Sequence, residues 1–429
     1  MRNLSGKRVT VVGMARSGTA AVELLVEKGA IVRAVDEKVT GEVAGVRIEP
    51  QNEAAFTDAD LVVLSPGVPA DLDVLHGRRV IGDLELASWF LQGPIIGITG
   101  SNGKTTTTAL TGHILLASGV PCQVGGNIGT PPCSMVKPSR ADQWNVLELS
   151  SFQLETIEEF RAQIGVALNI TPDHLDRHHS LENYAAAKRR LFETQEDGDY
   201  AVLNADDATC VEYAKHTKGT PVWFSLQWPV SSGMWLADEV LHYDREVLMR
   251  AADVPLRGRH NLENVMAASI ACRLAGALLE PIAGAVKTFP GVEHRIEFVR
   301  RVGGVDYYND SKATNVDATL KSIDAFPGGL WIILGGKDKD SDYTVLREPL
   351  LSKARAALLI GAAAEKIKNQ IGNAVPIVDS GTIEQAIRTA AASAVAGETV
   401  LLAPACASFD QFNNYEHRGK VFKELVNQL

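Results

Sequence analysis

The chain has 429 residues, of which 45% are hydrophobic and 22% are charged, as is ordinary for a globular protein. At roughly 150 residues per domain, this length predicts about three domains. The formal net charge is −10 at pH 7, and no basic run stands out. We therefore expect the chain to bind neither nucleic acid nor an anionic membrane surface.

The cysteines and the N-terminal sequence bear on the compartment. The cysteine count is odd and no CxxC pair is present, which indicates neither a disulfide framework nor a zinc site. A strand pattern begins almost at once, with no signal-peptide pattern and no run of about 18 apolar residues. We expect a cytoplasmic protein with reduced thiols and no membrane insertion.

The first block of the chain, which Gly93-Pro94 closes, alternates strand and helix patterns. Strands are predicted at 7–13, 31–36 and 59–67, and a helix from about Ser17 to Lys28. Strands separated by helices predict a parallel sheet with crossover helices.

A glycine turn follows the first predicted strand, in the sequence GMARSG. Ala15 stands where dinucleotide-binding folds carry the glycine that lets the backbone approach a pyrophosphate, which disfavours a nicotinamide site. Two interpretations stay open: a structural turn, or a helix N-terminus that receives the phosphates of one nucleotide, with Arg16 and Ser17 as donors. Asp36 ends the second strand, either as a ribose acceptor or in a solvent-facing turn.

The second block, to about residue 291, and the third block continue the alternation. Apolar strands are predicted at 94–99, 144–149, 163–171, 200–207, 330–336, 354–361 and 397–408, irregular β structure at 221–255, and helices up to Ala117 and up to Gly276. Ligands of open α/β sheets lie outside the carboxyl ends of the strands, so we expect the chemistry at those ends.

The stretch GITGSNGKTTTT resembles a phosphate-binding loop with a displaced glycine. The generic loop has Gly, four residues and then Gly-Lys-Ser/Thr, but Ile98 stands five residues before Gly103. The order strand, glycine turn, helix is the expected one, and backbone N–H groups at such a turn bind anions. We expect Lys104 to reach a terminal phosphate and Thr105 to bind Mg²⁺.

Two further segments of the second block carry charge. Glu148 ends a buried strand, where an unpaired carboxylate is costly, so either a cation such as Mg²⁺ relieves that cost or the side chain is a surface acid. Three histidines and two aspartates lie between Asp173 and His179, but there is no HExxH pattern and Pro172 predicts a loop, which leaves zinc or a metal-neighbouring loop open. Lys188 follows on a helix, where most lysines are solvated.

The third block places charged or hydroxyl groups beside several strand ends. The segments are GVEHRIEF, YYNDSKATN, GGKDKDSDY and ACASFDQFNNYEHRG. A surface loop would explain each one alone, whereas all of them in one block favour a site.

These motifs resemble those of the Mur ligases, the amide-forming ligases of peptidoglycan synthesis. The family's phosphate loop, T-G-[ST]-N-G-K-[ST], matches Thr99–Thr105, so the displaced glycine is a mark of this family. The resemblance extends from residue 6 to residue 420 and includes SPGVP, GGNIGTP, LELSSFQLE, DHLDRH, YAAAK, RHNLEN, HRIE and LGGKDKDSDY. Within the family the resemblance is strongest to the member that adds D-glutamate. The chain has DSKATN where sister ligases carry a histidine-containing motif, and it lacks DNPR, the motif by which another member recognises diaminopimelate.

The resemblance implies an α/β fold in three domains. These are a Rossmann-like domain for a UDP-sugar at 1–91, a central P-loop ATPase-like domain with a mostly parallel sheet at 92–291, and a Rossmann-like amino-acid domain at 292–429. It implies ATP-dependent addition of D-glutamate to UDP-N-acetylmuramoyl-L-alanine (UDP-MurNAc-L-Ala) through an acyl phosphate, with two Mg²⁺ ions and a monomeric chain. Two alternatives stay open: a ligase for another amino acid, and a nucleotide-binding regulator without turnover.

The resemblance also implies roles for single residues. ATP is expected at Gly100, Ser101, Asn102, Gly103, Lys104, Thr105, Thr106, Asn264, Arg295, Asp310 and Lys312. Mg²⁺ is expected at Thr105, Glu148, His174 and Lys188, with Lys188 carbamylated. The expected catalytic groups are Lys104, Glu148, His174 and Lys188. The UDP-sugar is expected at Arg16, Ser17, Asp36, Ser65, Gly67 and Asn127. D-Glutamate is expected at Lys312, Thr314, Lys339, Ser408 and Tyr415.

Overall fold

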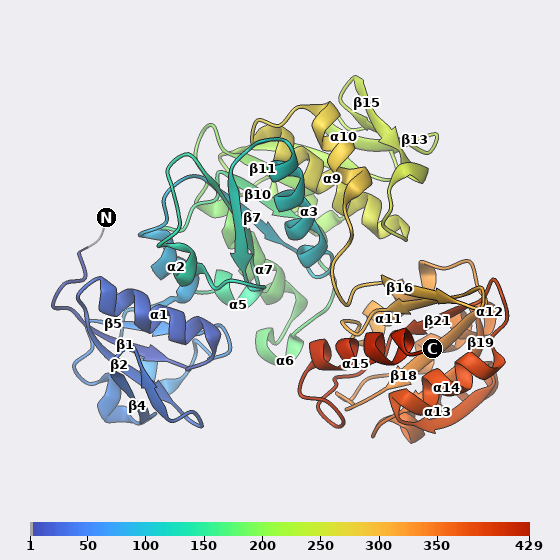
Figure 1. Ribbon diagram of the computed structural model, residues 1–429. Coiled ribbons are helices and arrows are strands. Elements are labelled where there is room, and N and C mark those ends of the chain that lie inside the picture. The colour runs from blue at the N-terminus through green and yellow to red at the C-terminus, as the bar shows by residue number, and fades with distance from the viewer. Residues whose placement is uncertain (1–2) are drawn as a thin grey trace. The chain divides into compact units, whose positions relative to one another are not determined.

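The computed structural model describes residues 3–429; Met1 and Arg2, which belong to the predicted first domain, lie outside the described residues. The chain forms two compact units, one of residues up to 254 with 262–289 and one of 255–261 with 290–429. Within the described chain, two sheets lie in the first unit and one in the second (Figure 1). The predicted α/β class is confirmed, while the boundaries of three domains stay a prediction.

The first sheet is parallel except at one edge. Its strand order is β3-β4-β2-β1-β5-β6, and only β3 runs antiparallel to its neighbour. The strands are β1 Arg8–Val12, β2 Ile31–Asp36, β3 Gly41–Val43, β4 Val46–Pro50, β5 Leu61–Leu64 and β6 Val80–Gly82. Two helices, α1 (Arg16–Glu27) and α2 (Asp83–Ser88), cover one face with the short α4 (Pro132–Met135), and two 3-10 turns, η1 (Glu53–Phe56) and η2 (Asp73–Leu75), cover the other.

The second sheet has the order β15-β14-β13-β12-β11-β10-β7-β9-β8. The run from β8 to β13 is parallel, and β13, β14 and β15 form an antiparallel meander. The strands are β7 Ile95–Thr99, β8 Cys122–Gly126, β9 Trp144–Glu148, β10 Ile164–Ala167, β11 Tyr200–Asn204, β12 Thr220–Ser225, β13 Gly233–Ala237, β14 Val240–Tyr243 and β15 Glu246–Arg250. The irregular β structure predicted at 221–255 is confirmed.

Helices pack on this sheet from both sides. Figure 1 shows α3 and α10 on one side, and α5 and α7 on the other. The helices are α3 Lys104–Ala117, α5 Ser151–Leu154, α6 Leu175–His178, α7 Leu181–Glu193, α8 Ala208–Tyr213, α9 Arg259–Leu274 and α10 Leu279–Thr288. The loop predicted after Pro172 is wrong in part, because the one-turn helix α6 forms there between two histidines with left-handed backbone, His174 and His179.

The third sheet has the order β16-β17-β21-β18-β19-β20 and is parallel except for β16. Its strands are β16 Glu297–Val302, β17 Val305–Asn309, β18 Leu330–Gly335, β19 Ala354–Ile360, β20 Ile377–Gly381 and β21 Thr399–Leu402. One face packs on α11 (Val316–Asp324), α12 (Arg347–Lys353) and α13 (Ala364–Ile371), and the other on α14 (Ile383–Ser393) and α15 (Tyr415–Asn427).

Strand β7 explains where the site forms. Its residues, IIGIT, are all buried, as is typical of a central parallel strand covered on both faces. It lies between β10 and β9, with Ile98 opposite Glu148. The carboxyl ends of these strands therefore meet at one edge, and the phosphate-loop sequence begins there. None of the helices within residues 3–429 combines the length and apolar character that crossing a bilayer requires.

Candidate functional site

The phosphate loop is held open by hydrogen bonds to the segment that follows β10. The N–H of Ser101 donates to the Asn169 carbonyl over 2.8 Å, and the N–H of Asn102 donates to Asn169 Oδ1 over 2.9 Å. The Ser101 hydroxyl donates to the Thr171 carbonyl over 2.8 Å. These contacts within the protein help to fix the conformation of the loop.

Gly103 has to be glycine for two reasons. It caps α3 with a φ of 87°, which is left-handed. A Cβ at this position would also lie 2.2 Å from Asn264 Oδ1. This close approach brings Asn264, from α9, against the N-terminus of α3, where Thr107 Oγ1 donates to its Oδ1 over 3.2 Å. The first unit thus places Asn264 beside the phosphate loop, while its contact with ATP stays a prediction.

The loop lysine folds back over its own turn. Lys104 Nζ donates to the carbonyls of Gly100 and Ser101 over 2.8 and 2.9 Å. The neighbouring Thr105 and Thr106 are buried, and Thr106 Oγ1 has no hydrogen-bond partner. The first turn of α3 therefore gathers a cation, hydroxyls and helix N–H groups, which together suit a polyphosphate.

Glu148 is a buried carboxylate with one oxygen left over. Only 2% of the residue is exposed, and its Oε1 accepts from Asn127 Nδ2 over 3.0 Å. Its Oε2 is buried without a hydrogen-bond partner. An uncompensated carboxylate oxygen is costly in such surroundings, and a divalent cation would offset that cost. The surface-acid interpretation of Glu148 is therefore wrong, and Asn127 lies beside Glu148.

Lys188 on α7 is buried, so the solvated interpretation is wrong as well. The residue is 1% exposed, and its Nζ donates to the Gly100 carbonyl over 2.9 Å. Burial, and then the charge of Lys104, lower the pKa of the Lys188 amine well below its ordinary value. The amine is therefore held close to the phosphate loop in a form that readily loses its proton and becomes nucleophilic.

His174 is more open than its neighbours. Half of its side chain is exposed, and its ring contacts Phe152 edge-on with 4.9 Å between centroids. Its backbone has a φ of 52°. Within the described side chains, which exclude that of Asp176, no group of three or more His, Cys, Asp and Glu residues is arranged to hold a metal, so the zinc alternative gains no support.

The residues expected to bind the UDP-sugar lie at the carboxyl ends of β1, β2, β5 and β8. Arg16 begins α1 and is exposed, and Ser17 follows it. Ser65 is buried after β5, and no atom would obstruct a Cβ at Gly67.

Asp36 already accepts backbone hydrogen bonds from Met14, Lys38 and Val39 over 2.6 to 2.8 Å. Burial raises the pKa of Asp36, but these N–H groups outweigh it and hold the pKa below the ordinary value. The Asp36 carboxylate therefore organises the turn after β2, and any ribose contact shares an oxygen with these backbone groups.

In the second unit, Asp310 lies buried beyond β17 and accepts a hydrogen bond from the Ser322 hydroxyl. Burial raises the pKa of Asp310, and the charge of Arg295 acts in the opposite direction. Arg295 Nε is itself buried without a hydrogen-bond partner. Lys312 Nζ lies 5.7 Å from the centre of the Tyr415 ring. The second unit therefore brings these four predicted residues into one region.

The remaining residues expected at the amino acid differ in exposure. Ser408 is buried and Thr314 is half-buried, whereas Lys339 is exposed in the loop after β18. That loop is anchored one residue earlier, where Asp338 accepts from Lys366 Nζ over 2.6 Å and from the Tyr343 hydroxyl over 2.7 Å. These hydrogen bonds are part of why the pKa of Asp338 falls to about 2, although burial acts to raise it.

Arg418 is a structural centre of this region that the sequence analysis missed. It is fully buried, and it donates to the hydroxyl and carbonyl of Ser311 over 2.9 and 2.8 Å and to the Cys406 carbonyl over 3.2 Å. Burial lowers the pKa of its guanidinium to about 10. The missed signal is its helical spacing, because Arg418 shares one face of α15 with the buried Phe422 and Val426.

Comparisons with known proteins identify the family of the chain. Two family models match, described as the Mur ligase middle domain over residues 98–272 and the Mur ligase glutamate ligase domain over residues 294–406. The chain is 61% identical to a protein of Solibacter usitatus over 99% of both chains, and 49% identical to one of Koribacter versatilis over 100% of this chain and 98% of that one. Both relatives are named UDP-N-acetylmuramoylalanine–D-glutamate ligase.

Solved structures agree on the fold. MurC from Thermotoga maritima matches with a TM-score of 0.63 and 16% identity, covering 98% of this chain and 99% of that one. MurF from the same organism, solved in complex with ADP, matches with a TM-score of 0.63 and 18% identity, covering 99% and 96%. At these identities the similarity concerns the fold.

Proposed function

The chain belongs to the Mur ligase family, and we propose that it joins D-glutamate to UDP-MurNAc-L-Ala with the cleavage of ATP. It is an amide-forming ligase of peptidoglycan precursor synthesis. The observation that carries the choice of substrate is the 61% identity, over 99% of both chains, to a relative named as the D-glutamate ligase. We further propose that it works in the cytoplasm as a monomer, within the predicted domains 1–91, 92–291 and 292–429.

The reaction has two steps. The substrate carboxylate attacks the γ-phosphorus of ATP and gives an acyl phosphate and ADP. The neutral amine of D-glutamate then attacks the acyl carbonyl, and inorganic phosphate leaves from the tetrahedral intermediate. Such chemistry asks the protein mainly for positioning and for charge neutralisation.

The phosphate loop receives ATP in this proposal. The N–H groups from Gly100 to Thr106 surround the phosphates, and Lys104, which folds over the carbonyls of Gly100 and Ser101, reaches the terminal phosphate. Asn264 extends the site from α9, while Arg295, Asp310 and Lys312 of the second unit contact the nucleotide.

Mg²⁺ fits the residues present. Glu148 offers a buried oxygen without a partner, and His174 offers a half-exposed imidazole. The amine of Lys188 can add CO₂ and release a proton, which leaves a carbamate anion next to the phosphate loop. When bound with Thr105 and these groups, Mg²⁺ neutralises phosphate charge. His174 is a candidate for the base that deprotonates the amine.

Both substrates have expected contacts. The UDP-sugar lies against Arg16, Ser17, Asp36, Ser65, Gly67 and Asn127. D-Glutamate lies against Lys312, Thr314, Lys339, Ser408 and Tyr415. Lys339 pairs with a carboxylate of the amino acid, because it is the exposed cation among them.

One assay decides between this function and its alternatives. The chain is incubated with UDP-MurNAc-L-Ala, ATP, Mg²⁺ and one amino acid at a time, and phosphate release is measured. We expect release with D-glutamate and not with L-glutamate, L-alanine or diaminopimelate. Release with another amino acid would show a different amine preference, and no release with any of them would contradict the proposed function.

The carbamate has its own test. Replacing Lys188 with alanine removes the amine, and a short-chain carboxylic acid added to this variant can occupy the vacated space. We expect activity to be lost and then partly restored by acetate, with no restoration in the Lys104→Ala variant. Equal effects of acetate on both variants would contradict the carbamate role.

A further inference from the structure

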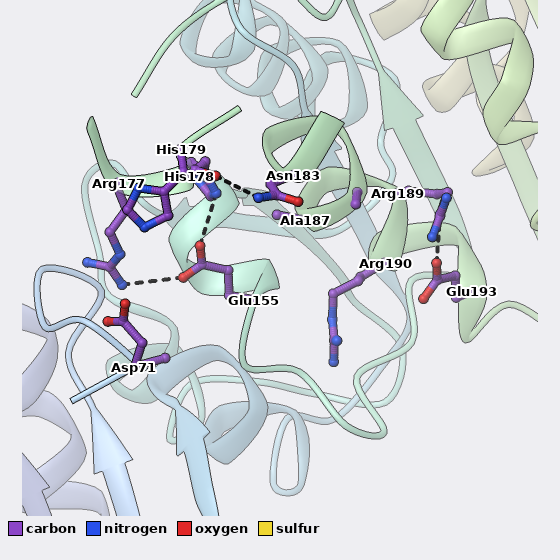
Figure 2. Close-up of a pocket in the computed structure, with 12 residues that line it drawn as sticks. Asp71, Glu155, Arg177, His178, His179, Asn183, Ala187, Arg189, Arg190 and Glu193 are labelled. Atoms are coloured by element: carbon purple, nitrogen blue, oxygen red, sulfur yellow. Dashed lines mark hydrogen bonds and ion pairs between the residues drawn. The ribbon is translucent and has the colours of Figure 1, made fainter. Parts of the chain in front are cut away.

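The carboxylate of Glu155 holds two consecutive side chains of α6. Its Oε2 accepts from Arg177 Nη2 over 3.3 Å, and its Oε1 lies 3.1 Å from His178 Nδ1. Figure 2 shows both contacts, with the carboxylate of Glu155, the residue after α5, directed at Arg177 and His178. We call Glu155, Arg177 and His178 the α6 clamp. None of the three carries a role in the proposed reaction.

The clamp acts on a strained segment. The residues on either side of α6, His174 and His179, have φ values of 52° and 65°, in the left-handed region that disfavours side chains with a Cβ. Such conformations persist where the surroundings hold them in place. The surroundings here are the clamp and Asn183, whose Nδ2 donates to the His178 carbonyl over 2.9 Å.

The clamp also reaches His174 through one aromatic ring. Phe152 stacks on His178 with 5.5 Å between centroids and meets His174 edge-on at 4.9 Å. The Arg177 guanidinium lies 4.8 Å from the centre of the same ring. The imidazole of His178 is also held at its other nitrogen, because Nε2 lies 2.9 Å from the Ser151 hydroxyl. The half-exposed His174 therefore owes its position to groups that the clamp holds.

Arg177 makes one contact outside this group. Its Nη2 also donates to the Val68 carbonyl over 3.1 Å, in the loop that carries Ser65 and Gly67. One guanidinium nitrogen thus serves the loop expected to bind the UDP-sugar and the clamp that holds the expected metal ligand. A shift of either loop changes this shared contact.

We infer that Glu155, acting through Arg177 and His178, is a positioning residue that sets His174 for its metal and couples metal binding to binding of the UDP-sugar. This inference rests on the proposed function, because it uses the roles proposed there for His174 and for the Ser65–Val68 loop. It adds a mechanism by which the two ligands favour each other. Coupling of this kind is reciprocal, so each ligand raises the affinity of the other by the same factor.

The chain offers a matched control for Glu155. The clamp borders a cavity of about 500 Å³ that is also lined by Arg189 and Glu193. These two residues form an ion pair of 2.8 Å along α7, seen at the right of Figure 2 and directed at each other. Glu193→Gln therefore changes the same charge beside the same cavity without touching the clamp.

The test measures binding without turnover, in the full chain with a non-hydrolysable ATP analogue. Mn²⁺ affinity is measured by electron paramagnetic resonance, and affinity for UDP-MurNAc-L-Ala by calorimetry with and without Mn²⁺. In Glu155→Gln we expect Mn²⁺ affinity to fall about tenfold, the scale for groups that orient a metal ligand, and the mutual enhancement of the two ligands to disappear. Glu193→Gln is expected to match the wild type in both.

Two results would overturn the inference. One is unchanged Mn²⁺ affinity and coupling in a folded Glu155→Gln variant; the other is an equal loss in Glu193→Gln. Arg177→Lys, which keeps the charge but cannot serve both acceptors, provides the same test if Glu155→Gln does not fold. The binding test does not depend on turnover. If the wild type binds both ligands but forms no amide in the separate activity assay, that result contradicts the proposed function and not this inference.

Discussion

The two units hold their charged site residues differently. In the first unit two of the expected functional groups are buried, because Glu148 and Lys188 are 2% and 1% exposed, whereas His174 is half exposed. In the second unit Arg418 is fully buried and binds backbone and a serine, and Asp310 is buried too, while Lys339 is exposed. The buried carboxylate and amine next to the phosphate loop are thus themselves expected functional groups, whereas the buried Arg418 supports a region whose expected amino-acid cation, Lys339, is exposed.

The largest effect expected from this difference is at Glu148. Glu148→Gln keeps the shape and the contact to Asn127 but removes the negative charge. We expect the ligation rate to fall by about 10³-fold or more, the scale on which charge-neutralising groups act in phosphoryl transfer. The melting temperature should not fall, because an uncompensated buried charge is removed. Normal activity, measured by phosphate release, would show that Glu148 holds no cation.

At Arg418 we expect the main effect to be on stability. Arg418→Met leaves the carbonyls of Ser311 and Cys406 without donors, so we expect the second unit to lose about 3–5 kcal/mol of unfolding free energy, as several buried acceptors lose their partners. Urea unfolding measures this loss. The control is Arg388→Met, which removes an exposed pair with Glu384 on α14 and should cost less than about 0.5 kcal/mol. Equal losses would contradict the role of Arg418 as the frame.

The strand ends and the phosphate loop could be predicted from the sequence. Apolar runs ending in glycine or polar residues located the strand ends, and the order strand, glycine turn, Lys-Thr identified the phosphate loop. Periodicity could not reveal that Lys188 is buried, since a lysine on a helix is normally solvated. The burial of Lys188 depends on the Gly100 carbonyl, which is far away in the sequence and becomes its neighbour only when β7 and α7 pack.

Short segments were hardest to predict for the same reason. Pro172 favoured a loop, yet α6 forms, and two side chains of that turn contact Glu155, which is distant in the sequence. Arg418 was missed because its acceptors, a serine and backbone carbonyls distant in the sequence, leave only its helical spacing as a signal. Residues whose partners are local could be predicted, and residues whose partners arrive through tertiary packing could not.

A buried acid in the first unit gives a pH-dependent prediction. Burial raises the pKa of Asp83 from 3.8 to about 6. The folded state therefore binds a proton more tightly than the unfolded state, so this contribution to stability is complete below about pH 4 and is lost as the pH rises through about 6. Relative to Asp83→Asn, which does not titrate, the wild type should lose up to about 3 kcal/mol between pH 4 and pH 8. Urea unfolding of both across this range checks it; a constant difference would contradict it.

The smallest effect is expected at Lys339. Because the side chain is exposed, Lys339→Ala should leave the melting temperature unchanged. Loss of the ion pair proposed between Lys339 and the substrate should raise the KM for D-glutamate about tenfold, with the KM for ATP unaffected. Lys337, an exposed lysine two residues earlier, provides the control. Lys337→Ala should change neither the KM for D-glutamate nor the KM for ATP. A lower melting temperature without a change in KM would give Lys339 a structural role.

The most direct test follows the oxygen atoms of the substrate. UDP-MurNAc-L-Ala labelled with ¹⁸O in both carboxylate oxygens is incubated with ATP, Mg²⁺ and D-glutamate, and the released phosphate is analysed by mass spectrometry. If the site transfers the phosphoryl group to the carboxylate and the amine of D-glutamate then displaces phosphate, each released phosphate carries one ¹⁸O atom. With L-glutamate in place of D-glutamate, we expect no phosphate to be released. Phosphate without ¹⁸O would show that water attacks ATP, and would contradict the account.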